Sequence, residues 1–130
     1  MQLNETNVIQ VQNPNTDIIS IIKVFKNPTK QQLQNLIIDD KYSTIRCFIL
    51  ENDIYCWSGF KLTHQEAKDT LLQQEGLEIN PLCGITINKD GFKLANSWNN
   101  IVISEINKEK ILHNPQLEYL FGKNYTIEGL

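Results

Sequence analysis

The sequence predicts a single α+β domain over residues 1–130, with a mostly antiparallel sheet of about six or seven strands and three short helices. Short apolar runs rich in β-branched residues recur along the chain, separated by Asn, Asp, Pro and Gly. Apolar residues at helical spacing occur in only a few segments. Strands and helices do not alternate as in a doubly wound fold, and the pattern leaves open whether the sheet closes into a barrel-like form.

Length and composition fit one independently folding unit. Folding a chain of 130 residues removes roughly two thirds of its unfolded surface from water, and no linker or low-complexity tract divides it. The longest apolar runs are far shorter than the ~20 residues of a membrane-spanning helix. The first residues lack the basic and apolar parts of a secretory signal. We therefore expect a cytoplasmic protein without membrane association.

The N-terminal part is predicted to form two strands and a helix. The strands cover 8–12 and 18–25, on either side of an Asn/Pro turn at 13–16. A proline and a threonine then favour a helix over 29–38, whose leucines and isoleucines share one face.

The next two apolar runs, 45–50 and 54–57, predict a β-hairpin. With 52–53 as a two-residue loop, Leu50 pairs with Tyr55, and the alternation of side chains then sorts the two strands into two faces. One face carries Arg46, Phe48, Leu50, Tyr55 and Trp57, and the other carries Ile45, Cys47, Ile49, Ile54 and Cys56.

A helix is predicted over 64–74. Thr63 and Glu66 have the spacing of a capping box, in which each side chain satisfies an open amide of the first turn. Gly76 is a typical stop residue after the helix.

The C-terminal part is predicted to contain a second hairpin, a further strand and a helix. The hairpin joins 83–87 to 92–95, with Gly91 at the left-handed position of its turn. The strand covers 101–106, and a proline start and a glycine stop favour a helix over 115–121.

Arg46, Tyr55, Trp57 and His64 are the candidate ligand-binding residues, because the predicted strands and helix start bring them into one neighbourhood. His64 is also the candidate catalytic residue, since an imidazole acts as acid or base near neutral pH. At the first turn of a helix the macrodipole disfavours its protonated form. The alternative is a structural histidine whose ring covers Trp57 or bonds a nearby carbonyl.

Arg46 is the single arginine among twelve cationic residues. Its guanidinium binds a carboxylate or phosphate through two parallel hydrogen bonds, which lysine does not reproduce. The structural alternative is stacking on Trp57, or pairing with Asp53 or Asp69.

Trp98 lies in an Asn-rich polar loop and is the candidate for a protein contact. A large aromatic side chain in such a loop is either used for contact or folded back against the core.

No cofactor or metal site is predicted, and no familiar catalytic motif is found. His64 and His113 lack a partner at ligand spacing. Cys47, Cys56 and Cys83 are odd in number and lie in apolar runs, which favours buried free thiols over a disulfide or a zinc site. The net charge of −3 and the lack of a lysine cluster argue against nucleic-acid binding.

One stretch resembles a small domain found in uncharacterised phage and prophage proteins. The matching pattern is Arg46-x8-Tyr55-x-Trp57-x5-Thr63-His64, within roughly residues 28–93. Ser58 stands where the domain usually carries an acidic residue. The resemblance implies a mobile-element origin, in keeping with the AT-rich coding bias of 18 Ile, 15 Asn and 11 Lys against one Arg.

The sequence therefore favours a non-enzymatic, phage- or mobile-element-encoded module that binds a protein of the virion or of the host, in the bacterial cytosol or in the virion. One alternative is a small enzyme or ligand-binding protein for an anionic metabolite, using Arg46 and His64. Another is an immunity or inhibitor protein that meets a basic toxin with acidic residues such as Asp39, Asp40, Glu75 and Glu78. Homo-oligomerisation is left open.

Overall fold

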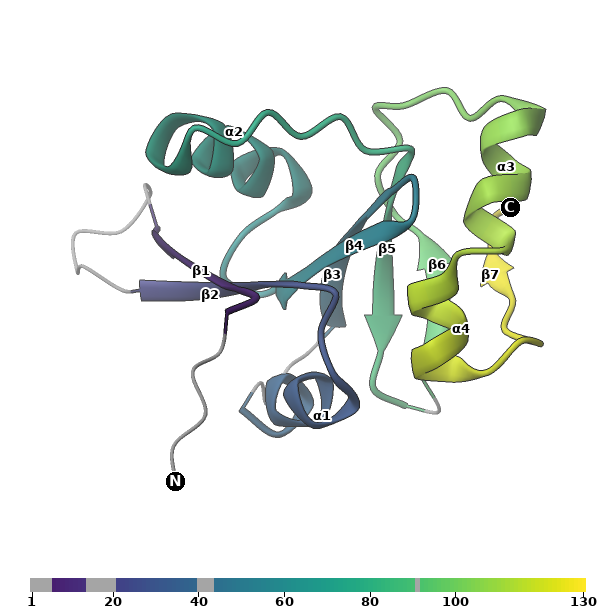
Figure 1. The fold of residues 1–130 in the computed structure, drawn as a ribbon, viewed down its shortest axis with the longest axis horizontal. Coiled ribbons are helices and arrows are strands. Elements are labelled where there is room, and N and C mark those ends of the chain that lie inside the picture. The colour runs from purple at the N-terminus through teal and green to yellow at the C-terminus, as the bar shows by residue number, and fades with distance from the viewer. Residues whose placement is uncertain (1–5, 14–20, 40–43, 91) are drawn as a thin grey trace.

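The computed structural model describes residues 6–13, 21–39, 44–90 and 92–130 and confirms an α+β fold with a seven-stranded, mostly antiparallel sheet (Figure 1). The strands are β1 Val8–Gln12, β2 Ile21–Lys26, β3 Thr44–Leu50, β4 Asp53–Ser58, β5 Cys83–Asn88, β6 Lys93–Asn96 and β7 Ile127–Glu128. The helices are α1 Lys30–Asp39, α2 His64–Glu75, α3 Glu105–Leu112 and α4 Pro115–Phe121. The three predicted helices correspond to α1, α2 and α4.

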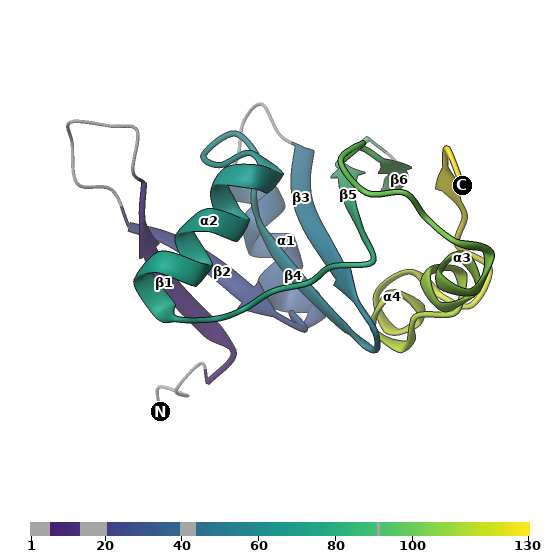
Figure 2. The ribbon, with the colours of Figure 1, turned by 90° about the horizontal axis from the view of Figure 1, so that it is seen from above.

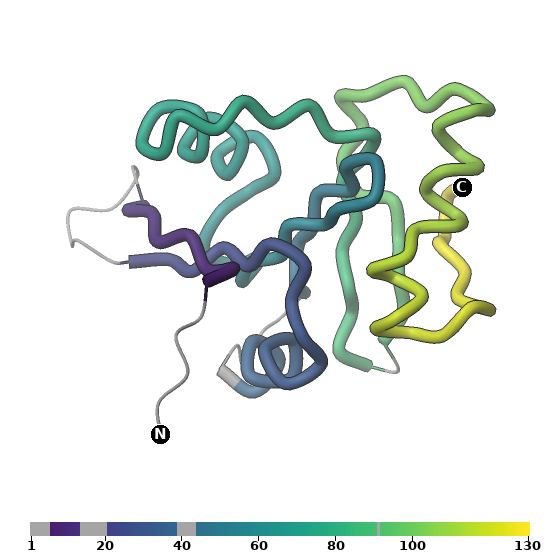
Figure 3. Tube along the Cα trace, in the orientation of Figure 1, coloured from purple at the N-terminus to yellow at the C-terminus, as the bar shows by residue number. Residues whose placement is uncertain are grey.

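The strand order is β1-β2-β4-β3-β5-β6-β7, and every neighbouring pair is antiparallel except β6 and β7. The sheet is open, because β1 and β7 form its two edges and do not pair, so no barrel is formed. The trace in Figure 3 shows the N-terminal strands and the C-terminal helices at opposite ends of the molecule.

Helices cover both faces of the sheet, and each face has its own core. Figure 2 shows α2 in front of the sheet and α1 behind it. The α2-side core contains Val11, Ile22, Val24, Phe48, Tyr55, Trp57, Leu62, Ala67, Leu71, Ile79 and Trp98. The α1-side core combines strand residues with Leu33 and Leu36 of α1, Ile111 of α3 and Leu117 of α4.

The predicted faces of the β3–β4 hairpin are found, although the predicted register is wrong. Leu50 pairs with Asp53 and Phe48 with Tyr55, so the loop is 51–52 rather than 52–53. Moving the loop by one residue shifts each cross-strand pairing by two positions, and side chains alternate with period two. The assignment of side chains to faces therefore survives the change of register.

The capping box predicted for α2 is confirmed, and α1 carries a similar one that was not predicted. The Thr63 hydroxyl accepts from the amide of Glu66, and the Glu66 carboxylate accepts from the amide of Thr63. Thr29 and Gln32 make the same reciprocal pair at α1. Gly76 ends α2 in the left-handed conformation, with φ of 68°.

The predicted strand over 101–106 is wrong, because α3 begins inside it. Ser104 is extended and its hydroxyl accepts from the amide of Asn107, which starts the helix. Ile103 packs on the α1-side core, whereas Val102 and Ile106 are exposed. The N-cap and this packing override the strand preference of the β-branched residues.

The predicted hairpin of β5 and β6 is confirmed, with Asn88 opposite Lys93. Phe92 takes a left-handed φ of 54°, while the predicted position for that conformation, Gly91, lies outside the described residues. The turn at 14–16 and the start of the second strand at 18–20 also lie outside them. None of the helices in the described part of the chain has both the length and the apolar character to cross a bilayer.

Candidate functional site

Arg46, Tyr55, Trp57 and His64 are brought together on the α2 side of the sheet. Arg46 lies directly opposite Trp57 in the β3–β4 register. His64 is the first residue of α2, and the capping box at Thr63 holds this helix start above the strands. The predicted neighbourhood is therefore present in the structure.

His64 is enclosed by aromatic rings and is only 2% exposed. Its ring centroid lies 5.8 Å from Phe48, 5.6 Å from Trp57 and 5.9 Å from Trp98, and it stacks on Trp98 with an interplanar angle of 11°. The space under the ring exists because residue 84 is glycine. A Cβ atom there would lie 2.7 Å from His64 Cδ2 and 2.6 Å from Trp98 Cβ.

The imidazole is neutral at physiological pH. The pKa of His64 is lowered from 6.5 to about 4: burial is the main cause, the charge of Arg46 adds to it, and hydrogen bonds to the backbone of Ile85 and Cys47 partly oppose it. Nε2 lies 3.2 Å from the carbonyl oxygen of Ile85. Because a carbonyl only accepts, Nε2 carries the proton in the neutral ring. The sequence attributes the neutral form to the helix macrodipole, whereas the main cause in the structure is burial.

Arg46 is half-buried beside this cluster. Its Nε is buried and donates to no described acceptor. The two carboxylates considered as structural partners are used elsewhere: Asp53 accepts from Asn27, and Asp69 accepts from Gln65. Gly59 leaves room for the arginine stem, since a Cβ there would lie 2.6 Å from Arg46 Cγ.

Trp57 and Tyr55 belong to the packed core of this face. Trp57 is fully buried, and its indole N–H donates to the carbonyl of Leu62 at 3.0 Å. Tyr55 is 7% exposed. Together with the rings around His64 they form a closed aromatic core, and the cavities described below are lined by other residues.

Trp98, the predicted contact residue, is folded back rather than presented to solvent. It is 7% exposed and stacks on His64, and the ammonium of Lys68 lies 5.9 Å from its ring centroid. Its indole N–H is buried without a partner among the described residues. Through Trp98, the Asn-rich loop packs against the α2-side core.

A cavity on the opposite face of the sheet was not predicted from the sequence. We call it the α1–α4 groove; its volume is about 920 Å³, within the usual range of small-molecule sites. Its lining includes Leu33 of α1, Leu94 of β6, Leu120 and Phe121 of α4, and Tyr125 and Ile127 of the C-terminal segment. No motif marks it, because its lining comes from segments far apart in the chain.

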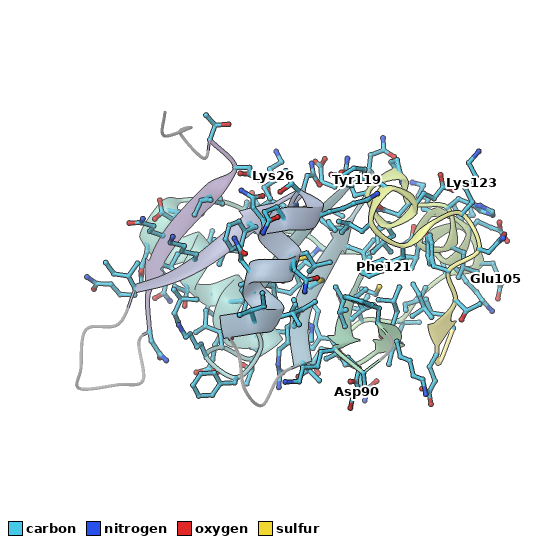
Figure 4. The ribbon with its side chains drawn as sticks, turned by 90° about the horizontal axis from the view of Figure 1, so that it is seen from below. Lys26, Asp90, Glu105, Tyr119, Phe121 and Lys123 are labelled. Carbon is cyan, nitrogen blue, oxygen red and sulfur yellow. The ribbon has the colours of Figure 1, made fainter. Side chains whose placement is uncertain are left out.

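Polar and aromatic residues define the rim of the α1–α4 groove. The backbone amide of Lys30 donates to the hydroxyl of Tyr119 at 3.3 Å, and the Lys30 ammonium lies 5.2 Å from that ring. Phe92 and Phe121 approach to 6.2 Å between ring centroids. Figure 4 shows Tyr119 and Phe121 on the side of α4 toward α1 and the β5–β6 hairpin. The α1–α4 groove therefore lies between α1, α4 and the β5–β6 hairpin.

A smaller cavity of about 300 Å³ lies beside β2, between Phe25, Leu36 and Phe60. No group of three or more His, Cys, Asp or Glu residues suited to a metal ion occurs in the described ranges.

Comparisons with protein-family models, with curated proteins and with solved structures find no match for this chain.

Proposed function

We propose that this protein acts by binding a protein partner, in a virion or against a host protein, without catalysis. The observation that carries the proposal is the enclosure of His64, the strongest acid/base candidate, in a closed aromatic core. Burial also raises the pKa values of the Cys47 and Cys83 thiols, which disfavours nucleophilic thiolates. His64, Cys47 and Cys83 therefore contribute to the packed core, and the open apolar surface lies in the α1–α4 groove.

The α1–α4 groove is the proposed binding site. Its lining includes apolar side chains and Phe92, which is 43% exposed. Tyr119, which is 49% exposed, lies next to the lining through its contact with Lys30. Half-exposed aromatic residues of this kind anchor protein interfaces. Two lysines, Lys30 and Lys93, line the groove beside one carboxylate, Glu128, so cations outnumber anions there in a chain whose net charge is −3. The occupant that fits is a segment with apolar side chains and at least one carboxylate.

The phage or mobile-element origin is part of the same proposal. Its support is the coding bias toward Ile, Asn and Lys together with the pattern around Arg46 and His64. A partner of the virion or of the infected host is the kind that such an origin implies.

The experiment selects binders from a random-sequence peptide library and measures their affinity by fluorescence anisotropy. Phe92→Asn removes an aromatic ring from the rim, and Asn tolerates the left-handed φ of that position. We expect selected peptides to combine apolar and acidic residues, and to bind Phe92→Asn roughly tenfold more weakly than the native protein.

Val102→Asn is the matched control, because Val102 is 96% exposed and lies outside the groove lining. Its affinity should equal that of the native protein. Failure to select any binder, or equal affinity for Phe92→Asn, contradicts the proposal. Salt-sensitive binding of a basic partner to Glu75 and Glu78, both exposed, would instead favour the immunity or inhibitor role.

One observation favours a second candidate, a ligand-binding protein for a small anion. Arg46 Nε and Trp98 Nε1 are buried donors without a described acceptor, and both residues adjoin His64. An anion entering there would satisfy them. The indole N–H resonance of Trp98 distinguishes the candidates, because only the second predicts that small carboxylates or phosphate shift it, and that Arg46→Gln abolishes the shift.

A further inference from the structure

We propose that Cys47 and Cys56 form a cross-strand disulfide under oxidising conditions, while Cys83 remains a thiol. Cys47 and Cys56 are direct partners in the β3–β4 register. Their sulfur atoms lie 2.7 Å apart, closer than two non-bonded sulfur atoms normally approach. All three cysteines are free thiols in the structure.

The hydrogen-bond pattern of the hairpin independently favours this pair. The amide of Gly59 donates to the carbonyl of Thr44, so these two residues form a hydrogen-bonded pair of the antiparallel ladder. Since hydrogen-bonded and non-hydrogen-bonded pairs alternate, Cys47 and Cys56 form a non-hydrogen-bonded pair, with Cα atoms about 4.5 Å apart. That separation lies inside the range that a disulfide spans, about 4.4–6.8 Å.

Cys83 is excluded as a partner by its position in the sheet. It lies opposite Ile49 in the β3–β5 register, whereas Cys47 lies opposite Ile85. Cys47 and Cys83 are therefore diagonal neighbours, whose Cα atoms are roughly 7–8 Å apart, whereas the Cα atoms of a disulfide are about 4.4–6.8 Å apart.

The oxidant in this proposal is a low-molecular-weight disulfide. The thiolate of one cysteine attacks it, forms a mixed disulfide and releases one small thiol; the second thiolate then displaces the other small thiol. The two protein thiols lose two protons and two electrons in all, and the small disulfide takes them up to become two thiols. Because Cys47 and Cys56 are fully buried, the exchange occurs while the hairpin folds or opens.

The test refolds the protein with oxidised glutathione, quenches the exchange with acid, and alkylates the denatured chain. We expect an intact mass that shows loss of two hydrogens and a single alkylated residue, Cys83, against three alkylated cysteines in the reduced protein. Cys83→Ser should lose the two hydrogens and show no alkylation. Peptide mapping should find Cys47 joined to Cys56.

Thermal unfolding provides a second readout on the native chain. We expect the oxidised form to unfold at a temperature on the order of 5–10 °C above the reduced form, since a bond formed without distortion restricts the unfolded chain. Three alkylated cysteines after the oxidising refold would overturn the proposal, as would linkage of Cys83 to either partner. An oxidised form that unfolds at or below the temperature of the reduced form would also overturn it.

Discussion

At the scale of single residues, His64 shows how packing changes the chemistry of a side chain. Its ring contacts three aromatic rings, and its Nε2–H has the carbonyl of Ile85 as partner. A neutral imidazole satisfies this environment, whereas a protonated one adds a buried charge close to Arg46. The residue that looks most catalytic in the sequence is therefore the centre of a core.

Burial of His64 makes folding stability depend on pH. The folded pKa of about 4 lies below the ordinary histidine pKa of 6.5, so between these values the unfolded chain binds more protons than the folded protein. The contribution is complete above pH 6.5 and is lost as the pH falls toward 4. We expect His64→Gln to remove about 3 kcal/mol of this pH dependence, measured by urea unfolding across that interval.

His113→Gln is the control, because His113 lies on the surface with its side chain 71% exposed. Its unfolding free energy should follow the native pH profile. Identical pH profiles for native protein and His64→Gln would show that His64 does not titrate as its burial requires.

At the scale of elements, Asn114 connects helix α4 to the sheet. Its side-chain oxygen accepts from the amides of Gln116 and Leu117, which caps α4. Its side-chain N–H group donates to the carbonyl of Glu51 in the β3–β4 turn, and its backbone amide donates to the hydroxyl of Tyr125. One fully buried side chain therefore joins α4 to the hairpin.

Removing this side chain leaves several buried groups without partners. We expect Asn114→Ala to lower the free energy of unfolding by about 2–3 kcal/mol, measured by urea denaturation. Asn114→Asp keeps the cap oxygens and loses the donor to Glu51, so its loss should be smaller. Asn99→Ala, at an exposed position, should change stability by less than about 0.5 kcal/mol. Equal effects at both asparagines would contradict this role.

At the scale of the whole molecule, β1 is an edge strand whose outer side pairs with no strand in the described part of the chain. The amide of Lys26 in β2 donates to the carbonyl of Asn7. Because hydrogen-bonded positions alternate along an antiparallel strand, Ile9 and Val11 also form backbone hydrogen bonds with β2. The backbone groups of Val8 and Gln10 point away from β2. The Gln74 side chain of α2 both accepts from and donates to the backbone of Gln12, which closes one end of the edge. An exposed strand edge is a site for strand pairing.

Amide exchange measured by NMR tests this edge. We expect slow exchange for Ile9 and Val11 and fast exchange for Val8 and Gln10, with Gln12 protected by Gln74. Gln74→Ala should speed exchange of the Gln12 amide by roughly tenfold or more, because its hydrogen bond is lost.

Gln73→Ala alters an exposed neighbour on α2 and should leave the exchange pattern unchanged. Protection of Gln10 equal to that of Ile9 would contradict a free edge. It would mean that another strand, such as β1 of a second copy, pairs there.

Features that depend on neighbours along the chain could be predicted from the sequence. Alternation sorted Arg46, Phe48 and Trp57 onto one face, and the Thr63–Glu66 spacing located the start of α2, because period and capping are local properties. The tertiary structure alone decided the hairpin register, the helix in place of the predicted strand at 101–106, the enclosure of His64 and the α1–α4 groove. Each of these results from contacts between segments far apart in sequence, where packing and burial outweigh local preference.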